Sequence, residues 1–312
     1  MVVYFTEASA HKLGQVMLRS VIAAGCAAAT LLVGCAQPSA QVEPTPTPTP
    51  IAPSSPLAST TSTSATPPEK PELSLTSVSN FRDVAVGGQM ARGVVFRSGK
   101  LQGLSDADER KLIAAGVTDV FDLRTDTVAK KSPDPAIDGV THHLVNIFAV
   151  PARSFPELHA AKAAIAEREQ LNRDFVIDPK QRERIGTLLR AIAEARGAVI
   201  IHCSEGKDRT GWASAMLQAI AGADRSAIVA DYLRSNEQRT AIIERGIAEA
   251  RKAGGTVAAE VARIRLVVAD DYLLAGLNEL TNRYGDVNGY LTKGLGLSEQ
   301  TIARLRTRLL AA

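Results

Sequence analysis

The sequence predicts an α/β domain in which a mainly parallel central sheet is flanked by helices. Ala198-Val199-Ile200-Ile201 is a run of four apolar residues with high strand propensity, which is typical of a strand buried on both faces. Before this run, short strand-like segments alternate with segments of helical periodicity, and the C-terminal third is almost entirely helical in its pattern. Such alternation favours parallel strands joined by helices.

The other elements follow from local periodicity and from turn residues. Before the central strand we expect a glycine-turned hairpin, a helix, two strands and two helices, at 82–97, 105–115, 117–123, 139–147, 157–170 and 180–196. Ser105 is expected to cap the first helix, with Asp108 completing a capping box. Gly197 is a stop signal before the central strand. After that strand, helices are expected at 209–221, 224–234, 236–253, 256–283 and 298–311.

The first 35 residues are expected to form an export signal rather than part of the fold. Val21 to Val33 is apolar, too short for a comfortable membrane span, and preceded by Arg19. The run ends in Leu32-Val33-Gly34-Cys35, which resembles a bacterial lipobox and implies cleavage before Cys35 and lipidation of its thiol. We therefore expect an exported protein, lipid-anchored at the outer face of the cell membrane. The alternatives are an ordinary cleaved signal and an apolar helix that stays uncleaved.

Residues 36–72 are expected to be a disordered linker, which leaves 73–312 as the folded domain. Ten of the 15 prolines fall in the linker together with many Ser and Thr residues, so it cannot bury enough apolar surface to offset chain entropy. The domain holds one of the three cysteines, Cys203, and can form no internal disulfide. The net charge of +3 comes with no basic run typical of nucleic-acid binding, so no nucleic-acid partner is expected.

One string of residues joins the central strand to the following helix and carries the chemistry: His202-Cys203-Ser204-Glu205-Gly206-Lys207-Asp208-Arg209-Thr210-Gly211. The backbone amides from Ser204 to Arg209 can curl around one point near a helix N-terminus, a geometry that binds a dianionic phosphate. Gly206 permits a backbone angle that other residues resist. The loop residues Ser204, Glu205, Gly206 and Lys207, together with Thr210, are therefore expected to bind substrate.

Cys203 is the candidate nucleophile because the positive field of this loop should lower its pKa and favour the thiolate. Arg209 can fold back across the loop, where its planar fork would hold two phosphate oxygens. The leaving group needs a proton, and Asp208 is the nearest carboxylic acid in the sequence. The alternative role of Asp208 is that of a carboxylate that favours the helix dipole.

The neighbours of these residues have supporting roles, each with an alternative. Lys207 is expected to add positive charge at the loop rim, or else to be a solvated surface lysine. Thr210 could donate its hydroxyl hydrogen to the thiolate, or pack at the helix start. His202 is expected beneath the loop, where it tunes Cys203 or is a satisfied core histidine. Gly211 should allow close packing of the helix start.

The string resembles the signature of the bacterial tyrosine/serine protein phosphatases that are also similar to lipid phosphatases. Further segments that resemble the family's motifs begin at Asn80, Arg92, Gly116 and Tyr284, so the similarity covers about 78–311. The resemblance implies a cysteine-phosphatase fold, a phosphocysteine intermediate, no metal and no cofactor. It also implies Cys203 as nucleophile, Arg209 as phosphate binder and Asp208 as acid, with phosphorylated protein or phosphoinositide as substrate.

The sequence departs from the family at Glu205, where a small residue is common. A pocket-facing Glu205 would repel multiply phosphorylated lipids. Asp83, Arg82, Asp122 and Arg124 are secondary candidates, because the Asp-Leu-Arg segment could line the pocket mouth or pair with Arg82, and the pairing is favoured.

The predicted activity is phosphomonoester hydrolysis, most of all of phosphotyrosine, with Ser/Thr or phosphoinositide activity in addition. An inactive phospho-ligand binding lipoprotein is the alternative, and a pure binder would not need the thiol. A rhodanese-like or arsenate-reducing enzyme is a third class, and arsenate reduction usually needs resolving cysteines, which the body lacks.

Overall fold

The computed structural model describes residues 72–87, 89–148 and 159–310, and all of them fall in one compact unit. The predicted signal peptide, Cys35 and the predicted linker up to residue 71 lie outside the described residues. In the described part, no helix combines the length and the apolar character needed to cross a bilayer.

A five-stranded sheet with the order β1-β2-β5-β3-β4 forms the centre of the domain. The strands are Arg82–Asp83 (β1), Val95–Ser98 (β2), Val117–Asp122 (β3), Thr141–Leu144 (β4) and Ala198–His202 (β5). β1 pairs with β2 in antiparallel fashion, as expected for the predicted hairpin, and the other pairs are parallel. His202 lies opposite Ser98 on one neighbour and Asp122 on the other, so three strands end together at one edge.

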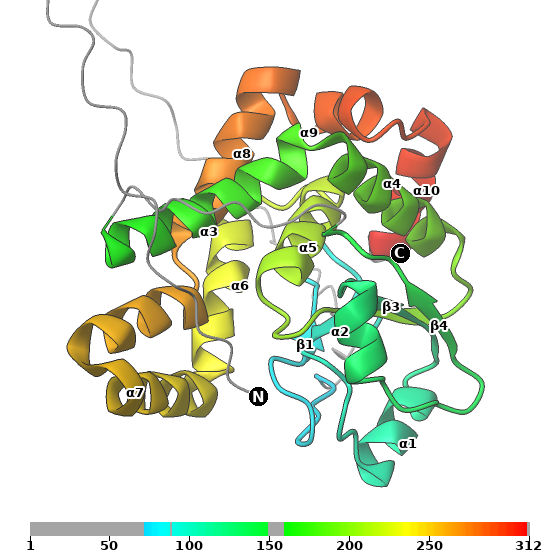
Figure 1. Ribbon diagram of the computed structural model, residues 1–312. Coiled ribbons are helices and arrows are strands. Elements are labelled where there is room, and N and C mark those ends of the chain that lie inside the picture. Colours follow the sequence, from blue (N-terminus) through cyan, green and yellow to red (C-terminus); the bar gives the residue numbers. More distant parts are fainter. Residues whose placement is uncertain (1–71, 88, 149–158, 311–312) are drawn as a thin grey trace, which may run out of the picture. The chain divides into compact units, whose positions relative to one another are not determined.

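Both faces of the sheet are covered, which confirms that β5 is buried on both sides. Val199 and Ile201 belong to the larger core cluster, whereas Ile200 belongs to a smaller cluster on the opposite face. The smaller cluster includes Leu112 of α1 (Asp106–Ala114). The larger one includes residues of α3 (Ala160–Ile177), α4 (Pro179–Glu194) and α5 (Asp208–Ile220). In Figure 1, α5 lies among the other elements and directly follows the loop at 203–207.

The remaining helices are short α2 and the C-terminal group, whose arrangement Figure 1 shows in yellow to red. Their bounds are Asp126–Lys131 (α2), Arg225–Glu237 (α6), Thr240–Leu266 (α7), Asp270–Tyr284 (α8), Val287–Gly289 (α9), the π-helical turn Tyr290–Gly294 (η1) and Glu299–Leu309 (α10). The predicted α/β class with a helical C-terminal third is therefore confirmed.

The capping box predicted at α1 is only half formed. The Ser105 side chain accepts the amide hydrogen of Asp108 at 3.3 Å, as expected. The Asp108 carboxylate does not return to Ser105, because it accepts hydrogen bonds from the amides of Thr76 and Ser77, both at 2.8 Å. The Ser105 amide donates to the Ser77 hydroxyl instead. Asp108 thus fastens the start of the domain to α1.

The predicted helix over 256–283 is two helices, because α7 ends at Leu266 and α8 begins at Asp270. Asn236 of α6 holds the connection in place: its side chain accepts from the amide of Val268 and donates to the Val268 carbonyl, both at 2.8 Å. The break expected between 253 and 256 also exists, since Gly254 and Gly255 have non-helical backbone angles inside α7.

Candidate active site

The loop from Cys203 to Lys207 connects β5 to α5 at the edge where β2, β3 and β5 end. Its carbonyl groups are bound on one side. The Asn80 side-chain amide donates to the carbonyls of Glu205 at 3.1 Å and Gly206 at 2.9 Å, and the Arg97 guanidinium also donates to Gly206 at 2.9 Å. In a trans peptide the next N–H points opposite to the carbonyl. These bonds therefore turn the following amides away from Asn80, as an anion-binding nest requires.

Gly206 is the one loop position where a side chain has no room. Its φ angle is +67°, and an added Cβ would lie 2.3 Å from the carbonyl oxygen of Ser98. Gly211 is similarly restricted, because a Cβ there would lie 2.7 Å from the Tyr232 ring of α6. The sequence-based roles of both glycines are confirmed as backbone requirements.

A buried charge cluster behind the loop fixes the residues that hold it. Asp231 of α6 binds Arg97 at 2.6 Å and Arg82 at 2.8 Å, and Arg82 donates to the Asn80 side-chain oxygen at 2.5 Å. Burial would raise the pKa of Asp231, but the charges of Arg97 and Arg82 lower it. The predicted pairing of Arg82 with the Asp-Leu-Arg segment is therefore wrong, because Arg82 pairs with the carboxylate of Asp231 from α6.

Cys203 is 3% exposed and is the only free cysteine among the described residues. Burial raises the pKa of its thiol. The charge of Arg209 and hydrogen bonds from Thr210 and the Glu205 amide lower the pKa by more, so the net shift is downward. The Thr210 hydroxyl is fully buried and forms no hydrogen bond to another nitrogen or oxygen atom of the described residues. This geometry favours the thiolate-donor role for Thr210, alongside its place at the start of α5.

Arg209 lies close enough to Cys203 for its charge to act on the thiol. Its guanidinium donates to the Leu123 carbonyl at 3.0 Å and stacks over the Phe148 ring, 4.4 Å from the ring centre. The planar group is thus oriented by a strand end and an aromatic face before any phosphate binds. Such a fixed fork suits bidentate contact with phosphate oxygens.

Arg124 lines the same cavity as the loop residues Ser204 and Glu205, and its ion pairs show which groups the Asp-Leu-Arg segment contacts. It binds Asp122 at 2.7 Å and Asp134 at 2.6 Å. Burial lowers the pKa of Arg124, but Asp122, Asp134 and the charge of Cys203 raise it by more. His202 is fully buried beneath the loop, as expected, with Nε2 3.2 Å from Asp134.

Asp122, Asp134 and His202 offer donor atoms within 4.8 Å of one another, a grouping that could hold a metal ion. Arg124 donates to both carboxylates, so a protein cation already balances their negative charge.

Asp208 is nearly buried at the first turn of α5. One carboxylate oxygen lies 3.4 Å from Arg168 of α3, and the other is buried without a partner among the described residues. The structure therefore leaves one oxygen of the candidate acid uncommitted. Arg168 was not predicted, since no pattern in α3 marks it.

Lys207 is not a solvated surface lysine, because it is only 3% exposed. Its ammonium donates to the carbonyl of Arg265 at the end of α7 and lies 3.3 Å from the Glu205 carboxylate. Glu205 also binds Arg239 at 2.7 Å, and Arg239 is only 1% exposed. In this conformation, Lys207 therefore contacts protein groups and not open solvent at a rim.

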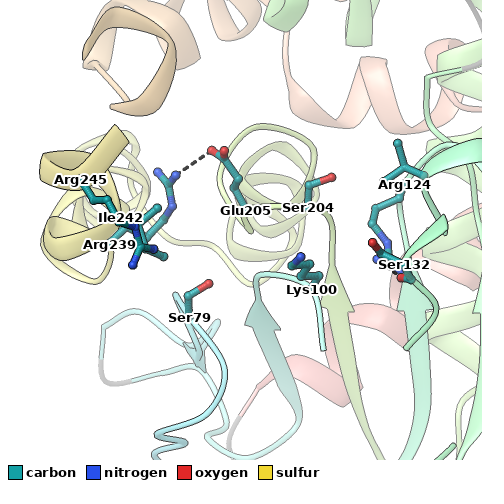
Figure 2. Close-up of a pocket in the computed structure, with 10 residues that line it drawn as sticks. Ser79, Lys100, Arg124, Ser132, Ser204, Glu205, Arg239, Ile242 and Arg245 are labelled. Atoms are coloured by element: carbon teal, nitrogen blue, oxygen red, sulfur yellow. Dashed lines mark hydrogen bonds and ion pairs between the residues drawn. The ribbon is translucent and has the colours of Figure 1, made fainter. Parts of the chain in front are cut away.

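A cavity of about 380 Å³ adjoins this group. Figure 2 shows Arg239 and Arg245 on one side, Ser204 and Glu205 near the middle and Arg124 on the far side. Lys100 and Ser79 also line it.

Comparisons with known proteins agree with this geometry. A model of the tyrosine phosphatase family matches residues 73–311. The triple specificity protein phosphatase PtpB of Mycobacterium tuberculosis is 32% identical in an alignment that covers 74% of this chain and 96% of that protein. A protein of Cupriavidus necator that carries the name of a tyrosine-protein phosphatase is 31% identical, with 77% of this chain and 89% of that protein covered. A tyrosine-protein phosphatase of Nostoc commune is 28% identical, with 68% and 73% covered.

Proposed function

This chain belongs to the tyrosine phosphatase family, and we propose that Cys203 is the nucleophile with which it hydrolyses phosphotyrosine. The observation that carries the assignment is the placement of Cys203. Its thiol has a lowered pKa and starts a loop whose carbonyls are bound from behind by Asn80 and Arg97. A thiolate at the base of an anion-binding loop needs only a phosphomonoester to react.

The proposed reaction has two steps. In the first, the Cys203 sulfur forms a bond to phosphorus while the bond from phosphorus to the phenolic oxygen breaks. Arg209 and the loop amides stabilise the charge on the three other phosphate oxygens. Asp208 gives its proton to the leaving oxygen. In the second step, water attacks the phosphocysteine, Asp208 takes the proton of that water, and inorganic phosphate and the thiolate are released.

The test of this assignment is turnover of p-nitrophenyl phosphate and a phosphotyrosine peptide by the full chain under reducing conditions. We expect turnover by the parent chain and none by Cys203→Ser, which should still bind inorganic phosphate. Turnover by Cys203→Ser at the parent rate would refute the nucleophile assignment. Phosphate binding without any turnover by the parent chain would favour the phospho-ligand binding alternative.

The acid role of Asp208 has its own test. Asp208→Asn should slow phenyl phosphate, whose leaving group needs a proton, more than p-nitrophenyl phosphate, whose leaving group does not. The carboxylate oxygen without a partner supports this role. An equal loss for both substrates would place the acid elsewhere.

We further propose activity beyond phosphotyrosine, on phosphoserine/threonine or phosphoinositides. The support is the similarity to a phosphatase named for triple specificity. One preparation assayed against phosphotyrosine and phosphoserine peptides and against phosphoinositide vesicles tests it, with Cys203→Ser as the control. Hydrolysis of the phosphotyrosine peptide alone would restrict the enzyme to phosphotyrosine.

Export and lipid anchoring through Cys35 are a separate proposal, supported by the apolar segment Val21–Val33 and the Leu32-Val33-Gly34-Cys35 sequence. Metabolic labelling with a fatty-acid analogue should label the parent chain but not Cys35→Ala. Labelling of both chains alike would refute the assignment of the lipidated residue.

A further inference from the structure

Glu205 is an unusual group for a phosphate-binding loop, because it places a carboxylate beside the anion site. Its side chain is 38% exposed, whereas the two cations that it binds are almost fully buried. Arg239 lies 2.7 Å from the carboxylate and Lys207 lies 3.3 Å from it. A partly solvated anion thus lies against two desolvated cations.

Without Glu205, these two cations would retain few partners. Lys207 would keep the carbonyl of Arg265, and Arg239 would keep the carbonyl of Leu266 at 2.7 Å. The Arg239 Nε is already buried, with no hydrogen-bond partner in the part of the chain that the structure describes. Buried cations that lack a full set of acceptors attract anions strongly, because protein screens charge far less than water.

Four of the ten described residues that line the cavity next to this group are basic: Lys100, Arg124, Arg239 and Arg245. Among those ten residues, Glu205 is the only acidic one. Figure 2 shows that the Glu205 carboxylate points toward Arg239 on the α7 side. Arg124 is neutralised by two aspartates, but Lys100 and Arg245 form no ion pair with a carboxylate of the described residues. The cavity therefore has a surplus of positive charge.

We propose that Lys207 and Arg239 form a second anion subsite beside the catalytic loop, and that Glu205 occupies it as an internal anion. The subsite is suited to a second phosphate on the residue next to the reacting phosphotyrosine, and Glu205 sets specificity by excluding it. This inference rests on the proposed function, since the first phosphate must bind at Cys203. A tethered carboxylate competes at a high effective concentration, so the parent chain should discriminate against doubly phosphorylated peptides.

The test compares two peptides that differ only in a second, adjacent phosphate: one with phosphotyrosine followed by tyrosine, and one with two successive phosphotyrosines. The measured quantity is the ratio of kcat/KM for the doubly and singly phosphorylated peptides. In Glu205→Ala this ratio should rise at least about tenfold, as expected when a like charge several ångströms from the second phosphate is removed. Glu183→Ala removes the same charge from α4, away from the cavity, and should leave the ratio unchanged.

A second variant identifies the cation. Adding Arg239→Met to Glu205→Ala should return the ratio toward the parent value, because the second phosphate loses its principal partner. If Glu205→Ala does not fold, Glu205→Gln keeps the side-chain length while removing the charge, and its ratio should also rise.

An unchanged ratio in a folded Glu205 variant that still hydrolyses the single-phosphate peptide would overturn the proposal. A rise with soluble inositol bisphosphate but not with the peptide would also overturn it, because the subsite would then serve a different substrate class. Failure of the proposed function is distinguishable, since every variant would then hydrolyse neither peptide.

Discussion

Replacement of Thr210 by valine should reduce the reactivity of Cys203 without removing the loop. The two side chains have nearly the same shape, and the Thr210 hydroxyl is fully buried, lowers the pKa of Cys203, and forms no hydrogen bond to another nitrogen or oxygen atom of the described residues. A hydrogen bond to a charged group contributes about 1.5 to 3 kcal/mol. Because about 1.4 kcal/mol corresponds to a factor of ten, the thiolate fraction below the thiol pKa should fall roughly 10- to 100-fold.

The assay is the rate of iodoacetamide alkylation at Cys203, followed by mass spectrometry of the Cys203 peptide so that Cys26 and Cys35 do not contribute. Because the donor stabilises the charged thiolate, its loss raises the pKa of Cys203, and the alkylation profile shifts to higher pH. Thr210→Ser keeps the hydroxyl and should restore the parent profile. Identical profiles for Thr210→Val and the parent chain would refute the hydrogen bond and leave Thr210 a packing role.

Three further substitutions test the site and the fold. Arg209→Lys should lower kcat/KM on p-nitrophenyl phosphate by roughly 1000-fold, because a point charge cannot replace a bidentate donor; near-parent activity would refute the phosphate clamp. Gly206→Ala places a Cβ 2.3 Å from a β2 carbonyl at a φ of +67°, so the loop must move and kcat/KM should fall at least about 100-fold; unchanged kinetics would mean that the loop adapts. Burial raises the pKa of Asp108, but hydrogen bonds from Lys111 and Ser77 lower it more. Asp108→Asn should therefore cost about 2 kcal/mol of unfolding free energy near neutral pH. The difference should begin to shrink below about pH 4, where the carboxylate of the unfolded parent chain takes up a proton before the folded one does; a pH-independent difference in urea titrations would exclude the charge as its cause.

The central strand and its loop could be predicted because local sequence determines them. Ala198 to Ile201 has the pattern of a buried strand, and Gly206 marks a turn whose positive φ the structure confirms. The two features meet at the sheet edge where β2 and β3 also end, which the parallel topology requires. The general place of the catalytic loop therefore follows from the sequence.

The partners of charged residues could not be predicted, because they come from distant segments. Arg82 binds Asp231 of α6, which is 149 residues away along the chain. Glu205 binds Arg239, the residue before α7, and Lys207 donates to the carbonyl of Arg265 near the end of α7. A sequence pattern reports the burial of a helix face, but it does not report which charge on that face reaches the site.

The boundary between α7 and α8 could not be predicted for a different reason. Neither glycine nor proline marks residues 267–269, and the helical periodicity continues across them. The connection is extended because Asn236 replaces both backbone hydrogen bonds of Val268 with bonds to its own side chain. A single tertiary contact thus overrides local propensity, which is a weak determinant over a few residues.

The bonds from Asn80 and Arg97 to the loop carbonyls have a thermodynamic consequence. They order the loop when the domain folds. The loop therefore loses its backbone entropy during folding rather than when phosphate binds. Binding of a bare oxyanion such as inorganic phosphate should then proceed with a small change in heat capacity, since little surface becomes ordered or buried. Release of phosphate likewise leaves the loop assembled for the next substrate.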